Sequence, residues 1–491
     1  MKHIWLSGCF LLFINTLFAQ DTDQAIKQTY SLEKARSIVE FIASDKLKGR
    51  DTPSEGLELA ADYAAAFFEN AGVHSAFGFE NYHQPVKMVN KGQPEELIIK
   101  YQGRIMSNTG NMVHLTGSDP LINAKVITYD PQINNIENHE LENKIIIVYI
   151  SKSDQLNPRE INEQSRKIER MARETNAKGL IEVFEGNHPY WSRFYNYYSR
   201  SRIDLAESED NNDDFHHVLV QDINSVFKTA AGNDPMGDIS IEILGKREEQ
   251  FVTNNIVGVV EGTDPILKNE FIVCSAHYDH VGVGQPDASG DSIYNGARDN
   301  AIGVMSVLLA AENIAKYPTK RSVVFLLLTG EEKGLLGSKW FIRESPLDLS
   351  KIFFCLNTDG GGYNDTTIAT VIGMRRINED QVFERACDAG GLEVFDGTDD
   401  TQFLFNNSDN IIFSQKGIPS VTFSVGFRGM NQEIIKHYHQ PSDEAETLNF
   451  NYVLKFAKSF GFALREIANS DKRLFWKEKD EFYDTGIQLY Q

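Results

Sequence analysis

The sequence predicts an α/β protein. Its main domain has three α/β/α layers around a mixed, largely parallel sheet, and a smaller, β-rich domain is inserted into it. From about residue 254 onward, continuous runs of Val, Ile, Leu and Phe alternate with helical segments, a pattern typical of parallel strands buried on both faces. Between about residues 95 and 244, the apolar runs are shorter and β-like. We therefore expect two architectures in one chain.

The expected elements follow in chain order. Residues 31–72 predict two helices, the second beginning near Pro53 and closed by Gly72. The expected strands of the middle part are Glu96–Tyr101, Ala124–Tyr129, Lys144–Ile150, Gly179–Val183 and His217–Val220. This part also predicts a long charged helix over residues 157–176 and an exposed excursion over residues 185–212. The last part alternates strands and helices over Glu270–Ala276, Asn300–Lys316, Arg321–Thr329, Leu335–Arg343 and Ile352–Asn357.

The domain organisation is expected to be discontinuous. The main domain should cover residues 20–104 and 249–491, with residues 105–248 as the insertion. Residues 1–19 predict a secretory signal peptide, because Lys2 precedes an apolar stretch that ends in the small residue Ala19. Cys9 precedes most of that stretch, whereas the cysteine of a lipoprotein box should follow it, so lipid anchoring is disfavoured. A secreted or periplasmic protein is expected.

Composition excludes several classes of protein. The 491 residues include 48 Lys and Arg and 70 Asp and Glu, giving a net charge of −22, which argues against nucleic acid as a partner. No run after the signal peptide reaches about 18 apolar residues, so no stable membrane insertion is expected. Beyond Cys9, the three cysteines Cys274, Cys355 and Cys387 permit one disulfide at most. Cys274 and Cys355 lie in apolar, strand-like runs, so small buried side chains are favoured there.

Polar residues follow three of the predicted buried strands at the point where each strand ends. His277 and Asp279 follow the first strand, Glu331 and Glu332 the second, and Asp359 the third. In open α/β sheets, ligands bind outside the carboxyl ends of the strands. We therefore expect these side chains to converge on one crevice.

Two further segments supply candidate ligands. Asp299 precedes a predicted helix, where Asp299 or Asn300 could equally be its N-cap. His437 and His439 precede Pro441 in a predicted loop. Imidazoles and carboxylates of this kind form a chemically sensible set for two zinc ions, which can share a bridging carboxylate.

The remaining carboxylates also have roles in such a site. Of the adjacent pair Glu331 and Glu332, one can bind metal while the other takes a proton from the attacking water. Asp279 lies two residues after His277 and can accept the other imidazole N–H of that histidine.

Six motifs at these residues resemble one family in their order along the chain. They are HYDHVG, NGARDNAIG, TGEEKGLLGS, NTDGGG, SDNIIFSQKGIPS and YHQPSDE, over roughly residues 260–450. They resemble the zinc-dependent exopeptidases of the bacterial leucyl aminopeptidase and glutamate carboxypeptidase group. The N-terminal stretch IASDKLKGRDT also resembles the opening helices of that family.

This resemblance implies a di-zinc metallopeptidase that hydrolyses a terminal bond of a peptide or protein, most readily as an aminopeptidase. His277 and Asp359 would each ligate one zinc or fall on opposite metals, and Asp299 would bridge both. Glu332 and His439 would be further ligands, so His437 would be a plain loop residue. The resemblance also implies that Glu331 is the general base, that Tyr438 stabilises the oxyanion, and that the peptide bond between Asp299 and Asn300 is cis.

The insertion resembles the protease-associated domain of many relatives, through NKIIIVYISK and AKGLIEV. That resemblance implies a lid or a substrate-recruiting module, and a passive insertion is the alternative. Three departures from the family pattern leave the substrate class open. They are Arg298 beside the bridging Asp, Asn410 after Ser408-Asp409, and the three glycines Gly360–Gly362 after Asp359.

Several other functions stay open. A glutamate-carboxypeptidase-like enzyme or a dipeptidase would need a cation for the substrate carboxylate, and Arg298, Arg375 and Arg428 are candidates. A glutaminyl cyclase shares the fold but works with one zinc, and the complete ligand set argues against it. A non-catalytic binding protein on this scaffold typically loses ligands or base, and neither is lost here. The oligomeric state is not predicted.

Overall fold

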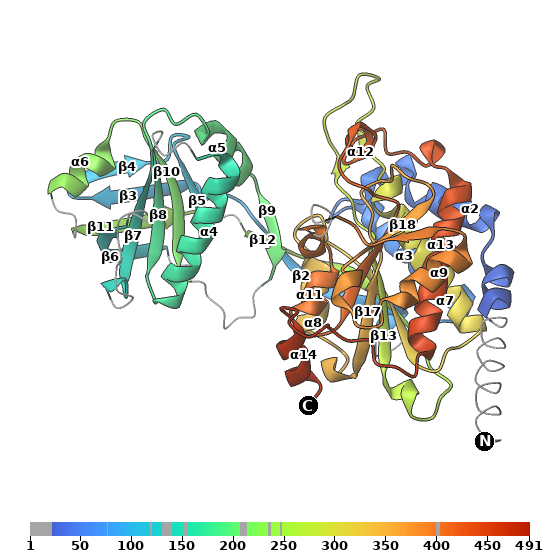
Figure 1. The fold of residues 1–491 in the computed structure, drawn as a ribbon. Helices are drawn as coiled ribbons and strands as arrows, with labels where there is room; N and C mark the ends of the chain where they lie inside the picture. The colour runs from blue at the N-terminus through green and yellow to red at the C-terminus, as the bar shows by residue number, and fades with distance from the viewer. Residues whose placement is uncertain are drawn as a thin grey trace. The chain divides into compact units, whose positions relative to one another are not determined.

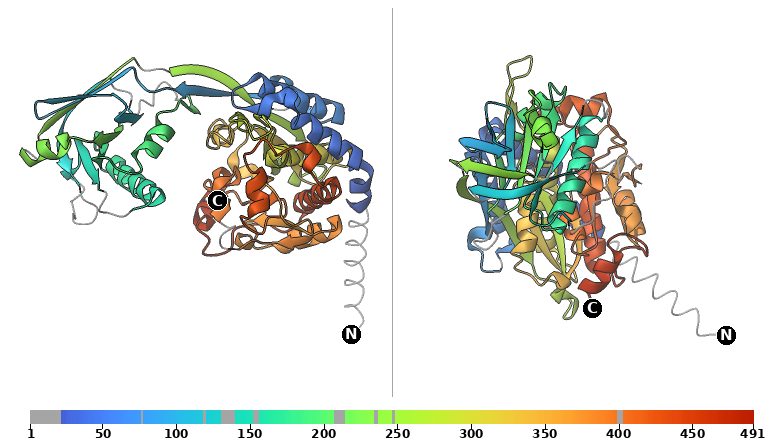
Figure 2. Two further views of the ribbon diagram at one scale, coloured as in Figure 1. Left: turned by 90° about the horizontal axis from the view of Figure 1, so that it is seen from above. Right: turned by 90° about the vertical axis from the view of Figure 1, so that its left-hand side faces the viewer.

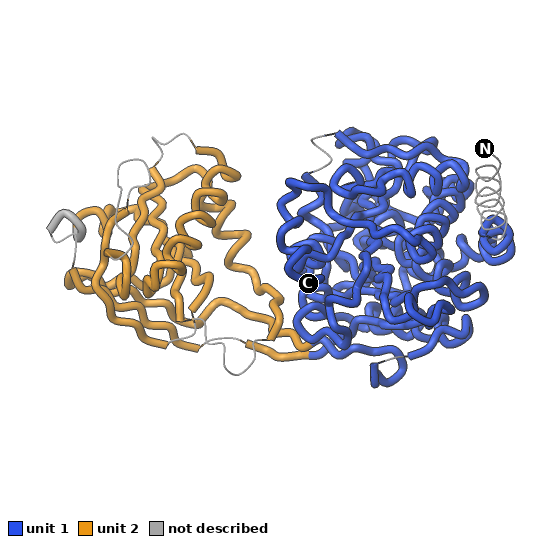
Figure 3. Tube along the Cα trace, turned by 60° about the horizontal axis from the view of Figure 1, so that its bottom comes forward, with its two compact units in different colours: residues 1–86, 252–491 blue, residues 87–251 orange. Residues whose placement is uncertain are grey.

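The chain divides into two compact units in its computed structural model. Unit 1 comprises residues 1–86 and 252–491, and unit 2 comprises residues 87–251 (Figure 3). The structure describes residues 22–75, 77–117, 120–129, 140–151, 156–206, 214–233, 237–245, 248–398 and 403–491. The predicted signal peptide and Cys9 lie outside the described residues.

The predicted boundary after residue 104 differs from the observed one after Val86. The physical reason is strand pairing: β3 (Glu96–Tyr101) pairs with β11 (Asp238–Leu244) and with β4 (Arg104–Ser107). Both partners lie in unit 2, so these strands belong to the insertion.

The sheet of unit 1 is mixed, with parallel strands at its centre. Its strand order reads β19 (Glu393–Phe395), β18 (Ile368–Ile372), β20 (Ser420–Ser424), β17 (Ile352–Asn357), β13 (Phe271–His277), β16 (Ser322–Leu328), β12 (Glu248–Val260) and β2 (His83–Lys91), with β1 (His74–Ser75) pairing β12. Within unit 2, β9 (Arg202–Leu205) pairs with residues 88–91 of β2. β16, β13, β17 and β20 run parallel, whereas β12 and β18 are antiparallel to their neighbours β16 and β20. The carboxyl ends of β16, β13 and β17 therefore lie together at one edge of the sheet.

Helices cover this sheet on both faces (Figure 1). The helices of unit 1 are α2 (Leu32–Ile42), α3 (Glu55–Ala71), α7 (Ile302–Lys316), α8 (Leu336–Arg343), α9 (Gln381–Gly390), α11 (Asn410–Ser414), α12 (Gln432–His437), α13 (Phe450–Asn469) and α14 (Tyr483–Leu489). The two predicted N-terminal helices are confirmed. Ser54 caps α3 by accepting a hydrogen bond from the Leu57 backbone N–H, and Gly72 ends it in the left-handed region at φ 77°.

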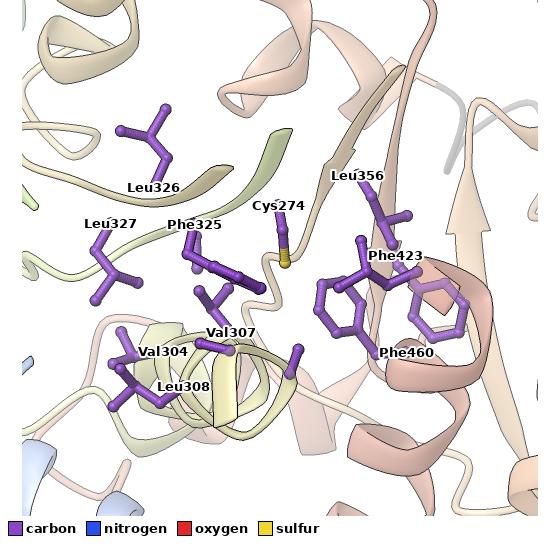
Figure 4. Packing of buried hydrophobic residues seen from close by; sticks show 14 of the residues in the cluster. Cys274, Val304, Val307, Leu308, Phe325, Leu326, Leu327, Leu356, Phe423 and Phe460 are labelled. Carbon is purple, nitrogen blue, oxygen red and sulfur yellow. The ribbon is translucent and has the colours of Figure 1, made fainter. Parts of the chain in front are cut away.

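The packing of β16 explains why its sequence is continuously apolar. Phe325 and Leu327 point toward α7, whereas Leu326 between them points the opposite way (Figure 4). On the facing side of α7, Val307 and Leu308 are fully buried. Both faces of the strand are thus removed from water, and no position along it calls for a polar side chain.

Unit 2 contains an eight-stranded sheet with its own buried core. Its order is β4, β3, β11, β6 (Leu121–Thr128), β7 (Lys144–Ile150), β8 (Gly179–Glu185), β10 (His216–Asp222) and β5 (Met112–Thr116). Helix α4 (Pro158–Glu174) lies along one face of the sheet and contacts β8 (Figures 1 and 2). The five predicted strands and the long charged helix are confirmed, the helix with a capping box formed by Asn157 and Glu160.

One prediction for unit 2 is wrong. Residues 185–212 were expected to be an exposed excursion, but their described part contains α5 (Trp191–Tyr198) and β9. Trp191 and Phe194 are each 5% exposed and pack on the ring of Phe184. Their rings are large enough that burying them is favourable, although polar residues flank them in the sequence.

Smaller elements complete the described structure. They are α6 (Val226–Asn233), β14 (Gly282–Val283), β15 (Ile293–Tyr294) and several 3₁₀ turns. Cys274 and Cys355 are free and buried, as predicted, and Cys387 is free and buried as well. None of the helices in the described ranges has the length and apolar character needed to cross a bilayer.

Candidate metal centre

The candidate ligands meet at the carboxyl edge of the unit 1 sheet. His277 is the last residue of β13, Glu331 and Glu332 follow the end of β16, and Asp359 follows the end of β17. Because β13 lies between β16 and β17, all three strand ends are neighbours. Asp299 reaches the same edge from the turn that precedes α7.

The side chains form two groups of potential ligands that share Asp299. In the first group, His277 Nε2 lies 3.3 Å from Asp299 Oδ1 and 3.2 Å from Asp359 Oδ1. In the second group, His439 Nε2 lies 3.1 Å from Asp299 Oδ2 and 3.2 Å from Glu332 Oε1. Asp299 thus offers one carboxylate oxygen to each group, which is the arrangement of a bridging ligand.

His280 also belongs to the second group, and sequence reasoning missed it. This histidine is fully buried, and its Nδ1 lies 2.9 Å from Glu332 Oε1. Its Nε2 is buried without a hydrogen-bond partner among the described residues. The available signal was its position three residues after His277 in the motif HYDH.

Asp279 holds the loop that carries both glutamates. Its Oδ1 accepts a hydrogen bond from the Glu331 backbone N–H at 3.1 Å, and its Oδ2 accepts one from Glu332 at 3.3 Å. Toward His277 the structure differs from the prediction in one respect. His277 Nδ1 lies nearer the backbone oxygen of Asp279, at 3.2 Å, than its carboxylate Oδ1, at 3.7 Å.

The turn before α7 separates the roles of Asp299 and Asn300. The peptide bond between them is cis, as the resemblance implied. Asn300 Oδ1 accepts a hydrogen bond from the Gly303 backbone N–H at 3.2 Å, so Asn300 caps the first turn of α7. Its Nδ2 donates to the backbone oxygen of Thr358. Asp299 is left to face the two ligand groups.

The electrostatics of the site fit a bound cation. Burial disfavours the ionised form of Asp299, yet hydrogen bonds from His277 and His439 hold the pKa of this carboxyl well below its usual range. Burial likewise opposes the ionised form of Glu332, but hydrogen bonds from His280 and His439 lower its pKa to about 2. Two ionised carboxylates this close and this buried need a compensating positive charge, and imidazole with carboxylate is a donor set that zinc accepts.

Glu331 has the opposite behaviour. Burial raises its pKa well above the usual range, and nearby Asp359 and Glu332 raise it further, against the effect of His277. Glu331 lies in neither ligand group. A carboxyl group with a raised pKa beside a metal site is suited to proton transfer.

Comparison with known proteins agrees with this geometry. Residues 255–461 match the model of Peptidase family M28. This part of the chain, less than half of it, is therefore similar to that family. The matched segment contains every predicted ligand and Glu331.

Two curated relatives extend the comparison. Over 259 residues the chain is 27% identical to the probable leucine aminopeptidase 2 of Aspergillus oryzae, covering 48% of this chain and 48% of that protein. Over 227 residues it is 25% identical to Aminopeptidase YwaD of Bacillus subtilis, covering 45% and 46%. The chain thus spans about half the length of the curated relatives it matches.

A solved structure matches almost the whole chain in fold. It is an aminopeptidase from Aneurinibacillus sp. strain AM-1, with a TM-score of 0.53 and 17% sequence identity, covering 93% of this chain and 98% of that one. At this identity the match concerns the fold alone.

The two ligand groups of unit 1 open into one pocket. Beside the ligands and Glu331, its wall contains apolar side chains from strands, helices and loops: Ile372, Leu404, Phe427, Met430, Ile434 and Tyr438. The Tyr438 ring stacks on His439 with 4.1 Å between ring centres. Burial raises the pKa of the Tyr438 phenol, so its hydroxyl stays protonated and able to donate.

The three arginines considered for a substrate carboxylate are engaged elsewhere. Arg298 donates to Asp443 at 2.8 Å, and Arg375 and Arg428 pair with other carboxylates. No arginine or lysine is among the described residues that line the pocket. His437 lies outside both ligand groups, as predicted, but it is not a loop residue: it is the buried last residue of α12, and its Nδ1 is 2.8 Å from the backbone oxygen of Ser442.

Proposed function

We propose that this chain is a zinc-dependent aminopeptidase that removes the first residue from peptides or proteins. One observation carries the proposal. Asp299 offers an oxygen to each of two ligand groups, while Glu331, with its raised pKa, lines the same pocket without belonging to either group. This is the layout of a two-metal hydrolase with a separate general base.

Two zinc ions per chain would be held by the two groups. His277 and Asp359 would bind the first, Glu332 and His439 would bind the second, and Asp299 would bind both. Bound zinc supplies Lewis-acid polarisation of the scissile carbonyl and lowers the pKa of the attacking water. His280 contacts Glu332 and fixes its carboxylate.

The protein's own groups would move the protons. Glu331 takes a proton from the attacking water and returns it to the leaving amine, as a carboxyl group with a raised pKa can. Tyr438 lines the pocket and donates a hydrogen bond to the oxyanion that develops on the carbonyl. Asp279 keeps Glu331 in place through its backbone N–H.

The pocket lining favours an amino terminus over a carboxyl terminus. Carboxypeptidase or dipeptidase action would need a cation for the substrate carboxylate, and none lines the described pocket. The apolar wall supports a preference for large apolar terminal residues. Exposed Phe403, Met430 and Ile435 lie in the same segments as that wall.

An unblocked peptide mixture tests this function. The zinc-loaded protein is incubated with peptides that have free or acetylated amino termini, and the products are read by mass spectrometry. We expect stepwise loss of amino-terminal residues from the free peptides and no loss from the acetylated ones. Loss from the carboxyl end would establish a carboxypeptidase, and no loss would support the binding-protein alternative.

For unit 2 and the amino terminus we propose accessory roles. Unit 2 is proposed to be a protease-associated-like module, with the parallel strands β7, β8 and β10 and the helix α4 as support. Export is proposed from the signal-like residues 1–19. Amino-terminal sequencing of the mature protein recovered outside the cytoplasm checks export, and Gln20 is the expected first residue.

A further inference from the structure

The C-terminal segment, residues 470–491, has no role in the ligand groups but is built firmly into unit 1. Trp476 is 1% exposed, and its indole Nε1 donates to the backbone oxygen of Gly417 at 3.0 Å. Farther along, the Tyr490 hydroxyl donates to the backbone oxygen of Ile352. The segment is therefore anchored at two separate points.

Arg376 joins this segment to a neighbouring turn. Its guanidinium donates to both carboxylate oxygens of Asp480, at 2.6 and 3.0 Å. The same guanidinium lies 4.3 Å from the ring centre of Phe405 and 4.8 Å from that of Phe482. A bidentate ion pair combined with stacking on two rings fixes an arginine in one orientation.

Phe405 connects this cluster to the pocket. It is 2% exposed and stacks on Phe482 with 6.2 Å between ring centres. It belongs to the 3₁₀ turn Phe403–Asn407, and two other residues of that turn, Leu404 and Asn407, line the pocket. Neighbouring residues of this turn thus face different sides: Phe405 contacts the C-terminal segment, whereas Leu404 and Asn407 line the pocket.

We infer that the C-terminal segment positions the apolar wall of the pocket through Phe482 and Arg376, and that it thereby sets the selection for large terminal side chains. Close-packed interiors transmit displacement, so a change under Phe405 moves Leu404 in the wall. Phe482 and Arg376 are positioning residues, since neither lines the pocket. The inference rests on the proposed aminopeptidase function.

The test compares Phe482→Ala with Phe482→Leu and with Tyr490→Phe. Tyr490→Phe is the matched control, because it removes a hydrogen bond of the same segment in which neither Phe405 nor Phe482 takes part. For each zinc-loaded protein, kcat and KM are measured on leucine and alanine p-nitroanilides. We expect Phe482→Ala to lower the leucine-to-alanine ratio of kcat/KM by about tenfold, mainly through KM for leucine. Phe482→Leu should restore most of the ratio, and Tyr490→Phe should leave it unchanged.

Hydrogen exchange of residues 403–407 is measured in the same proteins and needs no activity. Faster exchange there in Phe482→Ala than in Tyr490→Phe supports the coupling. An unchanged leucine-to-alanine ratio in Phe482→Ala, or an equal drop in Tyr490→Phe, overturns the inference. If the wild-type protein hydrolyses neither substrate, the proposed function fails instead. Even then, equal hydrogen exchange of residues 403–407 in Phe482→Ala and Tyr490→Phe would overturn the coupling between the C-terminal segment and the pocket wall.

Discussion

At the scale of single residues, the candidate site depends on buried groups that bind no substrate. Arg50 is fully buried, and its guanidinium donates to the backbone oxygens of Tyr278 and Asn295 at 2.9 and 2.7 Å. It therefore ties together the two loops that lead to His280 and Asp299. Asp279 does the same for the loop of Glu331 and Glu332. In metal sites, loss of such a supporting contact typically lowers metal affinity by about 10- to 100-fold.

Asp279→Asn tests this support. The carboxylate now accepts hydrogen bonds from two backbone N–H groups. The amide NH₂ of asparagine would face one of these donors, so the loop of Glu331 and Glu332 must shift. We expect zinc affinity to fall by about 10- to 100-fold, measured by competition with a chromogenic chelator. Asp287→Asn, on an exposed loop, is the control and should bind zinc normally. Normal zinc affinity in Asp279→Asn would contradict the supporting role.

At the scale of elements, the sequence predicted best where one pattern dominates. β7 was predicted with its observed ends, Lys144–Ile150, because it is a continuous apolar run. β5 was missed because it is only five residues long and its burial does not alternate. β11 was also missed, although Ile239, Ile241 and Ile243 alternate with polar residues along it and indicate a strand. His280 was missed because its orientation depends on a contact between distant parts of the chain. Arg50 holds the loop of His280 through the backbone oxygen of Tyr278, 228 residues later in the sequence, and no local pattern reveals that contact.

Helix α4 gives a prediction at the same scale. Buried His217 on β10 lies 3.6 Å from Glu169 of α4 and 3.1 Å from Glu182 of β8. Burial opposes protonation, but the two carboxylates raise the pKa of His217 to about 9. The hydrogen bond from His217 lowers the pKa of Glu169 to about 2, against burial.

The sign of the pH dependence follows from both shifts. A raised histidine pKa stabilises unit 2 fully below about pH 6.5, and this contribution is lost as the pH rises toward about 9. The lowered Glu169 pKa contributes above about pH 4.5 and is lost toward pH 2. We expect hydrogen exchange of α4, after correction for intrinsic rates, to accelerate between pH 6.5 and 9. The free energy of opening derived from it should fall by up to about 1.4 kcal/mol per pH unit. His217→Gln should abolish that slope, and an unchanged slope would contradict this account.

At the scale of the whole molecule, each unit has its own buried interior. Unit 1 is built around one large hydrophobic cluster that includes the central strands, and unit 2 has three smaller clusters of its own. The ligand groups belong wholly to unit 1. Any stabilisation by bound metal should therefore act on unit 1 alone.

Removal of zinc tests this separation. Calorimetry of the zinc-loaded protein should show two thermal transitions, because the units have separate interiors. After treatment with a chelator, we expect the transition of unit 1 to fall by several degrees, since a ligand present at about 100 times its Kd adds about 2.7 kcal/mol. The transition of unit 2 should stay in place. An equal shift of both transitions would contradict the assignment of the metal to unit 1.

The most direct test of the central claim is turnover of leucine p-nitroanilide by Glu331→Gln and the wild-type protein at equal zinc content. Glutamine has nearly the same shape but cannot accept the proton, and Glu331 lies in neither ligand group. The account predicts two zinc ions per chain in both proteins and a loss of kcat of about 100-fold or more in the variant. Near-normal turnover by a zinc-replete Glu331→Gln would contradict it.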